Sequence, residues 1–445
     1  MEENIQLGLD LGKVCGKKVV GKFDGGQLSS DGGAIFLSRI EKEVGIIDRL
    51  CNTIMDRRDK RYIEHEYKEL LSQRVYQIAC NYEDANDCNT LRSDPALKVA
   101  CGRLPEGSDL GSQATMTRLE NVPRRTELYR MGIAFVDNYT ASYSTPPQGI
   151  ILDMDDTCDP THGSQQLSLF NSYYDEQCYM PLHIYDGKSG QLILTVLRPG
   201  KRAKGVEIVA IVKRVIRQIR KKWPEVEIIL RGDSHFSVPE LHSWCLANSV
   251  HFVLGQTGNA ILLEHGKSLL EQAELLHKES GEKVRLFKSF HYQANSWEQP
   301  LRVILKAEIT EKGSNPRFLV TSFESCRASF IYDTVYCGRG TMENYIKAHK
   351  THLHSDRTSC TKFEANQFRL FLHGAAYVLM HTLRTVGLKG TELAKAQFNT
   401  IQNKILKIGT RVEELVTKVR FHFPTNYPFK GLIGTLCKNL IFSTA

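Results

Sequence analysis

The chain has 445 residues, of which 41% are hydrophobic and 24% are charged, with 33 Gly and 14 Pro. This length predicts several folded domains, and the composition excludes collagen-like and low-complexity proteins. Lys and Arg outnumber Asp and Glu by 58 to 50, so the chain is mildly basic, which permits a polyanionic partner without requiring one.

Local composition argues against two further classes. No segment approaches the ~18 consecutive apolar residues of a membrane-spanning helix, and the first residues are acidic where a signal peptide is basic. The 12 cysteines are sparse and include no Cys-x-x-Cys pair, which argues against a disulfide framework or a zinc ribbon. We therefore expect a cytoplasmic protein with no membrane partner.

The first third of the chain is predicted to be helical. Apolar residues recur at helical spacing through residues 33–140, beginning with Ile35, Leu37, Ile40, Val44 and Ile47. The polar segment ASYSTPPQG at 141–149 then marks a boundary. Residues 1–145 are therefore expected to form a helical N-terminal region.

Strands and helices alternate in the next segment. Apolar runs predict strands in GIILDMDDT (149–157), VEIILRGDS (226–234) and HFVLGQ (251–256), and a hairpin in MPLHIYDGKSGQLILTVL (180–197). Helices are predicted after the hairpin, up to Lys222, and in VPELHSWCLANS. A hairpin requires an antiparallel pair and crossover helices require parallel pairs, so we expect a mixed sheet in the element order of a ribonuclease-H-like domain.

The remaining residues are predicted to hold an insertion and a second helical part. After Gly258 a helical pattern precedes three apolar runs, VRLFKSFHYQ, LRVILKAEIT and PRFLVTSFE. The expected fold is thus α/β, a ribonuclease-H-like core (146–236 and 334–390) with a β-rich insertion (237–333) and helical flanking regions, the second at 391–445. Within that second region, a mixed-charge helix is predicted to reach about residue 420.

Basic residues are concentrated between Arg198 and Lys222, where ten Lys or Arg accompany a single acid, Glu207. This density is typical both of a solvated helix face and of a surface that follows a phosphate backbone. The sequence leaves both interpretations open, and Arg198, Lys201 and Arg202 are the candidate DNA contacts.

Acidic residues at predicted strand ends are the first candidates for chemistry. Asp153 and Asp155 lie two apart at the end of one strand, so they share a face, and Asp233 ends another strand. Glu343 lies in a predicted helix. Two strand-end carboxylates and one helical carboxylate are what a site for two divalent cations needs, because hard oxygen ligands hold Mg²⁺.

A second pattern places charged groups along one helix face. Tyr336, Arg339, Glu343 and Lys350 lie within about 60° of one another on a helical wheel, if the helix already includes Tyr336. Such a face would set a carboxylate between two cations, suited to a metal beside phosphates. The alternative is an ordinary amphipathic helix, and two glycines, Gly338 and Gly340, weaken the prediction of an early start.

This Y-x2-R-x3-E-x6-K pattern resembles the signature of DDE transposases of the insertion-sequence-4 superfamily. The segments FDGGQLSSDGGAIFL, RVYQIACNYEDANDCNTLRSDPALK, LDMDDTCDPTHGSQ and LRGDSHF are similar to the insertion sequence 1380 family. The resemblance extends over nearly the whole chain. It implies a ribonuclease-H-like transposase that cuts insertion-sequence ends and joins them to target DNA.

Carried over residue by residue, the resemblance implies catalytic and metal-binding roles for Asp155, Asp233 and Glu343, with two Mg²⁺ ions that Mn²⁺ could replace. Asp153 is the second choice for the first position. Arg339 and Lys350 would bind phosphates and Tyr336 would position the strand. The implied partners are double-stranded DNA, at terminal inverted repeats bound by the N-terminal region and at the target, and a second copy of the chain in the synaptic complex.

Trp297 is the candidate for one further role. Insertion domains of related enzymes carry a Trp that stacks on a base flipped out at a DNA hairpin, and Trp297 lies between two predicted strands. The alternative is that Trp297 packs in the core of the insertion itself. The sequence leaves both open.

Two other functions compete with the transposase interpretation. Asp153-x-Asp155-x-Thr157 after an apolar strand resembles the first motif of haloacid-dehalogenase-type phosphatases, in which the first Asp is the phosphorylated nucleophile. That interpretation leaves the spacing from Tyr336 to Lys350 unexplained. The other is a catalytically inactive, transposase-derived DNA-binding protein, which the presence of all three acids does not favour.

Overall fold

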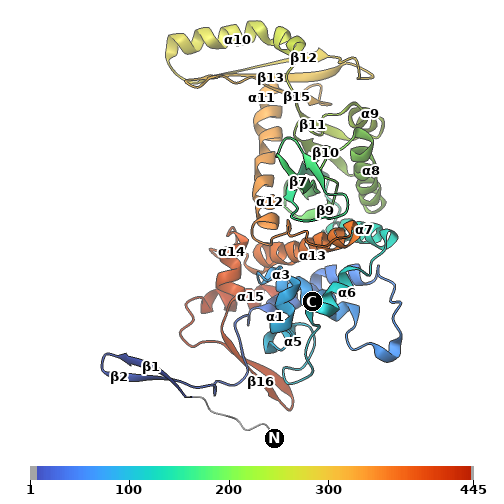
Figure 1. Cartoon of the computed structure of the whole chain (residues 1–445). Helices are drawn as coiled ribbons and strands as arrows, with labels where there is room; N and C mark the ends of the chain where they lie inside the picture. Colours follow the sequence, from blue (N-terminus) through green and yellow to red (C-terminus); the bar gives the residue numbers. More distant parts are fainter. Residues whose placement is uncertain (1–7, 442–445) are drawn as a thin grey trace. The chain divides into compact units, whose positions relative to one another are not determined.

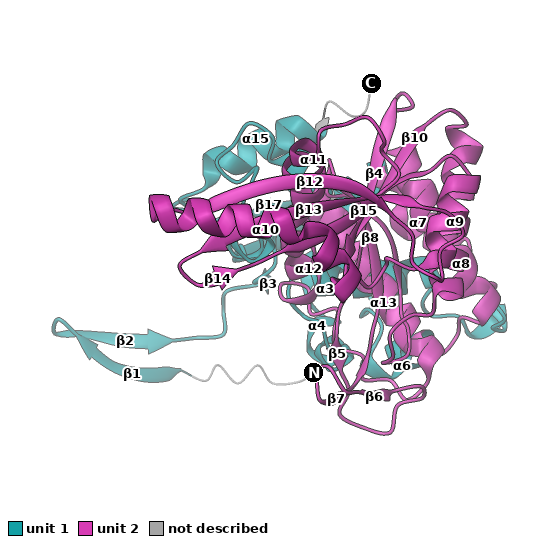
Figure 2. Ribbon diagram, turned by 90° about the horizontal axis from the view of Figure 1, so that it is seen from above, with its two compact units in different colours: residues 1–43, 56–119, 382–445 teal, residues 44–55, 120–381 magenta. Residues whose placement is uncertain are grey.

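The computed structural model describes residues 8–441, which divide into two compact units (Figure 2). Unit 1 comprises residues 1–43, 56–119 and 382–445, and unit 2 comprises residues 44–55 and 120–381. None of the helices within residues 8–441 is both long and apolar enough to cross a membrane.

A mixed β-sheet forms the centre of unit 2 (Figure 1). Its first five strands in chain order are β4 (Gly149–Asp156), β8 (Leu182–Asp186), β9 (Leu192–Val196), β10 (Glu227–Gly232) and β11 (His251–Gln256). They lie in the order β9-β8-β4-β10-β11. The hairpin pairs antiparallel and β4, β10 and β11 pair parallel, which is the ribonuclease-H-like arrangement expected from the element order.

Helices pack on this sheet through the apolar positions that the sequence indicates. In α8 (Gly205–Lys222) the buried side chains are Ile208, Val212, Val215, Ile216 and Ile219. Its neighbours are α7 (Arg125–Ala141) and α9 (Pro239–Ala247). A further helix, α13 (Phe363–Thr382), is buried along almost its whole length, and its Phe371 stacks on Phe135 of α7.

The β-rich segment after β11 extends the same sheet. It consists of α10 (Ala260–Ser280), β12 (Val284–Tyr292), β13 (Leu301–Thr310), β14 (Gly313–Ser314) and β15 (Arg317–Thr321). β15 pairs antiparallel with β11, so the strands of this segment continue the core sheet. α10 covers β12 and β13 (Figure 1). The range 237–333 expected for the insertion therefore also contains two core elements, α9 and β11.

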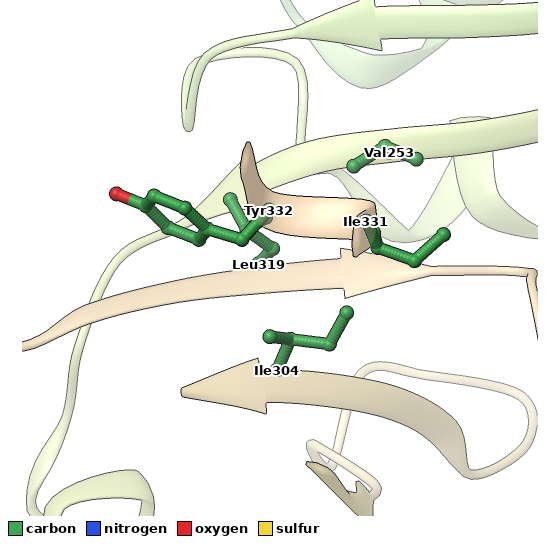
Figure 3. Packing of buried hydrophobic residues seen from close by; sticks show 5 residues of the cluster. All are labelled: Val253, Ile304, Leu319, Ile331 and Tyr332. Atoms are coloured by element: carbon green, nitrogen blue, oxygen red, sulfur yellow. The ribbon is translucent and has the colours of Figure 1, made fainter. Parts of the chain in front are cut away.

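A shared hydrophobic cluster joins this segment to the chain that follows it. Val253 of β11, Ile304 of β13 and Leu319 of β15 pack with the buried residues Ile331 and Tyr332 (Figure 3). These last two begin a π-helical turn, Ile331–Tyr336, which follows the short helix α11 (Ala328–Phe330). The cluster thus fixes the start of the segment that carries the Tyr-Arg-Glu-Lys pattern.

That segment changes its helical type twice before α12. After the π-helical turn, Cys337–Thr341 forms a 3₁₀ turn, and only then does α12 (Met342–Lys350) begin. Helical turns thus run from Ala328 to Lys350, but the regular α-helix starts after Tyr336 and Arg339. A Cβ on Gly338 would lie 2.7 Å from Nη1 of Arg231, so a glycine permits the close approach of this turn to β10.

Three further short strands of unit 2 form a small separate sheet. They are β5 (Asp159–Pro160), β6 (Leu169–Asn171) and β7 (Glu176–Tyr179), paired in the order β5-β7-β6. An isolated bridge between Tyr179 and Pro199 links β7 to the loop before α8. The arrangement brings the β6–β7 hairpin next to the first residues of the basic segment.

Unit 1 combines helices with two small sheets. Its helices include α1 (Ala34–Val44), α3 (Tyr67–Ala79), α5 (Pro95–Ala100) and α15 (Lys430–Ile441), and an N-terminal hairpin is formed by β1 (Leu9–Val14) and β2 (Lys17–Gly21). The second sheet joins β3 (Leu28–Ser29) to β16 (Thr410–Leu415) and β17 (Lys418–His422). The prediction of a helix up to about residue 420 is therefore wrong from residue 410 onward, where the chain forms β16 and β17. There Val412, Val419 and Phe421 alternate with charged residues, which suits strands.

Candidate active site at the ends of β4 and β10

Two neighbouring strands carry the candidate carboxylates to one edge of the sheet. β4 and β10 are parallel and in register up to the pair Asp153 and Arg231. Asp155 follows two residues later on β4, and Asp233 directly follows β10, so both leave the sheet at the same edge. Burial is the main cause of the raised pKa of Asp155, and the negative charge of Asp233 adds to it.

Asp153 is engaged inside the protein. Its side chain is 0% exposed, and its two carboxylate oxygens accept hydrogen bonds from Nε and Nη2 of Arg231 at 2.6 and 2.7 Å. The third nitrogen of that guanidinium donates to the carbonyl oxygen of Val335, in the π-helical turn. Asp153 and Arg231 therefore form a buried pair that joins β4, β10 and the helical segment above them.

Asp155 faces the edge of the site and contacts the Tyr-Arg-Glu-Lys segment. One carboxylate oxygen lies 2.7 Å from Nη2 of Arg339, and the side chain keeps 19% of its exposure. Burial raises the pKa of Asp155 to about 7, although the positive charge of Arg339 opposes the shift. Of the two aspartates on this face, Asp155 is thus the one that a ligand can reach.

The other residues of the pattern are placed differently. Tyr336 is half-buried, and its hydroxyl would be 3.0 Å from a Cβ on Gly255, so it reaches β11. Lys350 donates a hydrogen bond to the carbonyl oxygen of Cys158, and its Nζ lies 3.5 Å from Asp159. Tyr336, Arg339 and Lys350 therefore all contact the strands or the residues that follow them.

Glu343 lies in the first turn of α12 and its side chain is exposed. Within residues 8–441 no group of three His, Cys, Asp or Glu side chains is arranged to hold a metal ion. The carboxylates of Asp155 and Asp233 are hard oxygen donors at one edge, and in that respect they suit a divalent cation such as Mg²⁺ or Mn²⁺. The structure does not bring Glu343 into a ligand group with them.

Two residues that the sequence analysis did not single out complete the polar surroundings. Nδ1 of His235 lies 3.4 Å from Oδ1 of Asp156, and the backbone N–H of His235 donates to Oδ1 of Asp233 at 2.9 Å. The hydrogen bond with Asp156 raises the pKa of His235. The signal in the sequence is their position: Asp156 directly follows Asp155, and His235 lies two residues after Asp233.

The basic segment divides into buried and exposed groups. The side chain of Arg198 is 7% exposed, because its guanidinium lies near Asp156 and Glu207, at 3.9 and 3.7 Å, and donates to the carbonyl oxygens of Met180 and Lys201. Lys201 and Arg202 are exposed. Arg202 lies against the Asp233 loop, where Nη2 donates to the carbonyl oxygens of Ser234 and His235 at 3.2 and 3.4 Å.

Trp297 lies away from these residues, in an aromatic cluster. It is 8% exposed and makes edge-to-face contacts with His242 and Tyr292, at centroid distances of 5.1 and 5.4 Å. Its backbone N–H donates to the carbonyl oxygen of Ala294. These contacts are those of a residue that packs between α9 and the insertion strands.

The buried pair also bears on the phosphatase interpretation. That chemistry requires the first aspartate, Asp153, to attack a phosphate group. Both oxygens of Asp153 accept hydrogen bonds from Arg231 and the side chain has no exposed surface. A nucleophile needs access to its substrate, so the geometry disfavours this function.

Comparisons with known proteins give one family match and one similar solved structure. The family described as "Transposase DDE domain group 1" matches residues 11–443 of the chain. The fold is similar to that of the piggyBac transposase in a cryo-EM structure of its synaptic complex with hairpin DNA, at 11% identity and a TM-score of 0.44, covering 85% of this chain and 80% of that one. No curated protein matches the chain in sequence.

Proposed function

Because the chain belongs to the transposase DDE domain group 1 family, we propose that it is a DNA transposase that cleaves at insertion-sequence ends and joins them to target DNA. The observation that carries this proposal is the family match over residues 11–443, to which the fold adds two acids, Asp155 and Asp233, at one sheet edge. The narrower assignment to the insertion sequence 1380 family is supported by the sequence motifs.

In this proposal Asp155, Asp233 and Glu343 are the catalytic carboxylates and the ligands of two Mg²⁺ ions, for which Mn²⁺ can substitute. Such ions, when bound, activate water and stabilise a leaving 3′ oxygen. Arg339 now pairs with one carboxylate oxygen of Asp155, and release of this contact would free that oxygen for a cation. A DNA phosphate is a suitable new partner, because a guanidinium binds two phosphate oxygens at once.

The reaction consists of two phosphoryl transfers at one site. Water attacks the phosphorus at the element end, a new P–O bond forms, the bond to the 3′ oxygen breaks, and the proton lost by water is balanced by the one gained by the 3′ oxygen. The released 3′-hydroxyl then attacks a second phosphodiester in the same way. Since the protein contributes mainly position and charge to such reactions, a rigid strand edge suits the purpose.

The proposed DNA contacts follow from which cations are exposed. Lys201 and Arg202 are accessible, and Arg202 contacts the loop after Asp233. Arg198 is enclosed and is assigned to holding the loop at 200–202 in place, through the carbonyl oxygen of Lys201. Lys350 would bind a phosphate and Tyr336 would position the strand, each after exchanging its present contacts. The N-terminal region is proposed to bind the terminal inverted repeats, with two copies of the chain in the synaptic complex.

The test is strand cleavage on DNA that carries the ends of the element, found as short inverted repeats flanking the gene. We expect nicking in Mg²⁺ by the unaltered protein, and its loss in Asp155→Asn, Asp233→Asn and Glu343→Gln, each with DNA affinity retained or slightly increased because a negative charge is removed. A protein that binds these ends but never nicks them would be the inactive DNA-binding alternative. Rapid hydrolysis of small phosphomonoesters without nicking would support the phosphatase.

A further inference from the structure

Three aromatic side chains are exposed on the β6–β7 hairpin. Tyr173 is 81% exposed, Phe170 51% and Tyr174 38%. The rings of Tyr173 and Tyr174 meet edge to face with centroids 4.9 Å apart. Neighbouring aromatic groups that remain in water on a monomer are typical of a surface that binds a partner.

The hairpin is fixed to the loop that carries the exposed cations. The side-chain amide of Asn171 donates to the carbonyl oxygen of Gly200 at 2.8 Å, and its oxygen accepts from the backbone N–H of Tyr173 at 3.0 Å. A Cβ on Gly200 would lie 2.3 Å from the carbonyl oxygen of Cys178, so the loop lies directly against β7. The contacts between the β6–β7 hairpin and the loop at 200–202 therefore fix the exposed aromatic rings relative to Lys201 and Arg202.

A cavity of about 350 Å³ opens between these groups. Its lining includes Phe170, Tyr173, Tyr174, Lys201, Arg202 and His235. Two cations, one histidine and three aromatic rings form a surface suited to an anion that carries a flat apolar group. The volume is at the lower end of that of ligand sites, about 300–1,000 Å³, which suits one nucleotide and not a duplex.

The cavity adjoins the candidate active site. Asp156, the residue after Asp155, also lines it, and the charge of Asp156 is compensated by His235 and Arg198. A nucleotide in this cavity would therefore lie beside the position proposed for the scissile phosphate.

We propose that the β6–β7 hairpin and the loop at 200–202 form a site for an unpaired DNA nucleotide next to the cleavage position, with the base stacked on Tyr173 and Tyr174 and its phosphate held by Lys201 and Arg202. This inference rests on the proposed function. Bases inside a duplex present no free face to an aromatic ring, so the rings contribute only when the strand is unpaired.

The experiment compares a blunt duplex with the same duplex extended by a few unpaired thymidines, in the absence of divalent metal. We expect the unaltered protein to bind the extended duplex more tightly, and Tyr173→Ala to reduce that preference roughly 5- to 150-fold, the range for loss of one stacked base, while affinity for the blunt duplex is unchanged. A 2-aminopurine in the extension should lose fluorescence on binding the unaltered protein and should keep it with Tyr173→Ala.

Two controls separate stacking from other effects. Tyr173→Trp should retain the preference, because it keeps an aromatic face, and Tyr129→Ala should also retain it, because Tyr129 is an exposed tyrosine of α7 that does not line this cavity. Loss of the preference in Tyr129→Ala, or equal weakening of both duplexes in Tyr173→Ala, would overturn the inference.

The outcomes also distinguish this inference from the proposed function. If the unaltered protein binds and nicks duplex DNA but shows no preference for the extension, the nucleotide site is wrong and the transposase proposal stands. If it neither binds nor nicks any DNA, the proposed function fails and the nucleotide site fails with it.

Discussion

Asp153 and Asp155 lie on the same face of β4, two residues apart, and differ in accessibility because of one neighbour each. Arg231 is directly opposite Asp153 in the sheet and encloses it, whereas Arg339 reaches Asp155 from the helical segment. The sequence places both acids at a strand end but cannot distinguish them, since the residues that do so are about 80 and 180 positions away. Position within the fold, and not residue type, gives the two carboxylates different partners and different exposure.

The first prediction concerns the stability of these two sites. Asp153→Ala leaves the buried guanidinium of Arg231 without its carboxylate, so we expect the free energy of unfolding to fall by about 3–5 kcal/mol. Asp155→Ala removes a partly exposed pair and should cost less than about 1 kcal/mol. Urea unfolding of both variants measures the difference. Equal losses would mean that Asp153 and Arg231 are not paired as described.

The second prediction concerns Asp159, the buried acid beside Lys350. Burial raises its pKa to about 7 from the usual 3.8, although Lys350 opposes the shift. The folded state therefore holds this proton more firmly than the unfolded state, so the contribution of Asp159 to stability is fully present below about pH 4 and is lost as the pH rises through 7.

Asp159→Asn removes the titration and provides the comparison. The unfolding free energy of the unaltered protein relative to Asp159→Asn should decrease between pH 4 and pH 7, as followed by urea denaturation at a series of pH values. A difference that is constant with pH, or that increases, would show that Asp159 stays ionised in the folded protein.

At the scale of elements, local periodicity predicted the regular parts well. The stripe of α8, the strand pattern from β4 to β11 and the three apolar runs after Gly258 all correspond to observed elements. Two features were not predictable in this way. The hairpin at 410–422 alternates charged and apolar residues over too short a length to distinguish from a helix, and the π and 3₁₀ turns before α12 depend on packing against β10 and β11.

These irregular turns determine which residues of the Tyr-Arg-Glu-Lys pattern face the strands. The helical wheel predicts one common face for all four, as it would for an ideal helix. In the structure Arg339 contacts Asp155 and Lys350 contacts Asp159, while Glu343 is exposed. A sequence pattern can therefore identify the segment, but the change of helical type decides the orientation of each member.

The third prediction tests the close approach of the 3₁₀ turn to β10. Gly338→Ala would place a methyl group 2.7 Å from Arg231, and we expect a loss of about 1–3 kcal/mol in unfolding free energy. Gly340, two residues later, has no atom within 4 Å of its Cβ position, so Gly340→Ala should be neutral or stabilising by about 0.4–1 kcal/mol. The unfolding temperatures of Gly338→Ala and Gly340→Ala, compared with that of the unaltered protein, separate a packing clash from the effect of reduced backbone freedom. Equal changes in the two variants would exclude a clash with Arg231.

At the scale of the whole molecule, unit 1 is assembled from three separate segments. The side-chain amide of Gln402 donates to the carbonyl oxygen of Ala79, and a Cβ on Gly33 would lie 1.9 Å from the carbonyl oxygen of Ile405. β3 likewise pairs with β16, which is almost 400 residues later. Such contacts join the two ends of the sequence, and periodicity, which is local, carries no information about them.

The fourth prediction follows from the pairing of β15 with β11. Removing residues 259–322 and closing the chain with a short flexible linker would delete α10 and the strands β12 to β15. We expect the shortened protein to retain the helical signal of the rest of unit 2 but to associate with itself, as measured by light scattering at increasing concentration. A monomeric product would contradict this expectation.

The reason is that the inserted strands protect the parallel core from self-association. In the full chain, residues 251–254 of β11 pair with β10 on one side, and residues 253–256 pair with β15 on the other. Without β15 those backbone donors and acceptors, flanked by the apolar side chains of Phe252, Val253 and Leu254, would form an open sheet edge that another copy could extend. We therefore expect the inserted strands to keep the sheet of unit 2 from being extended by other copies into a polymer.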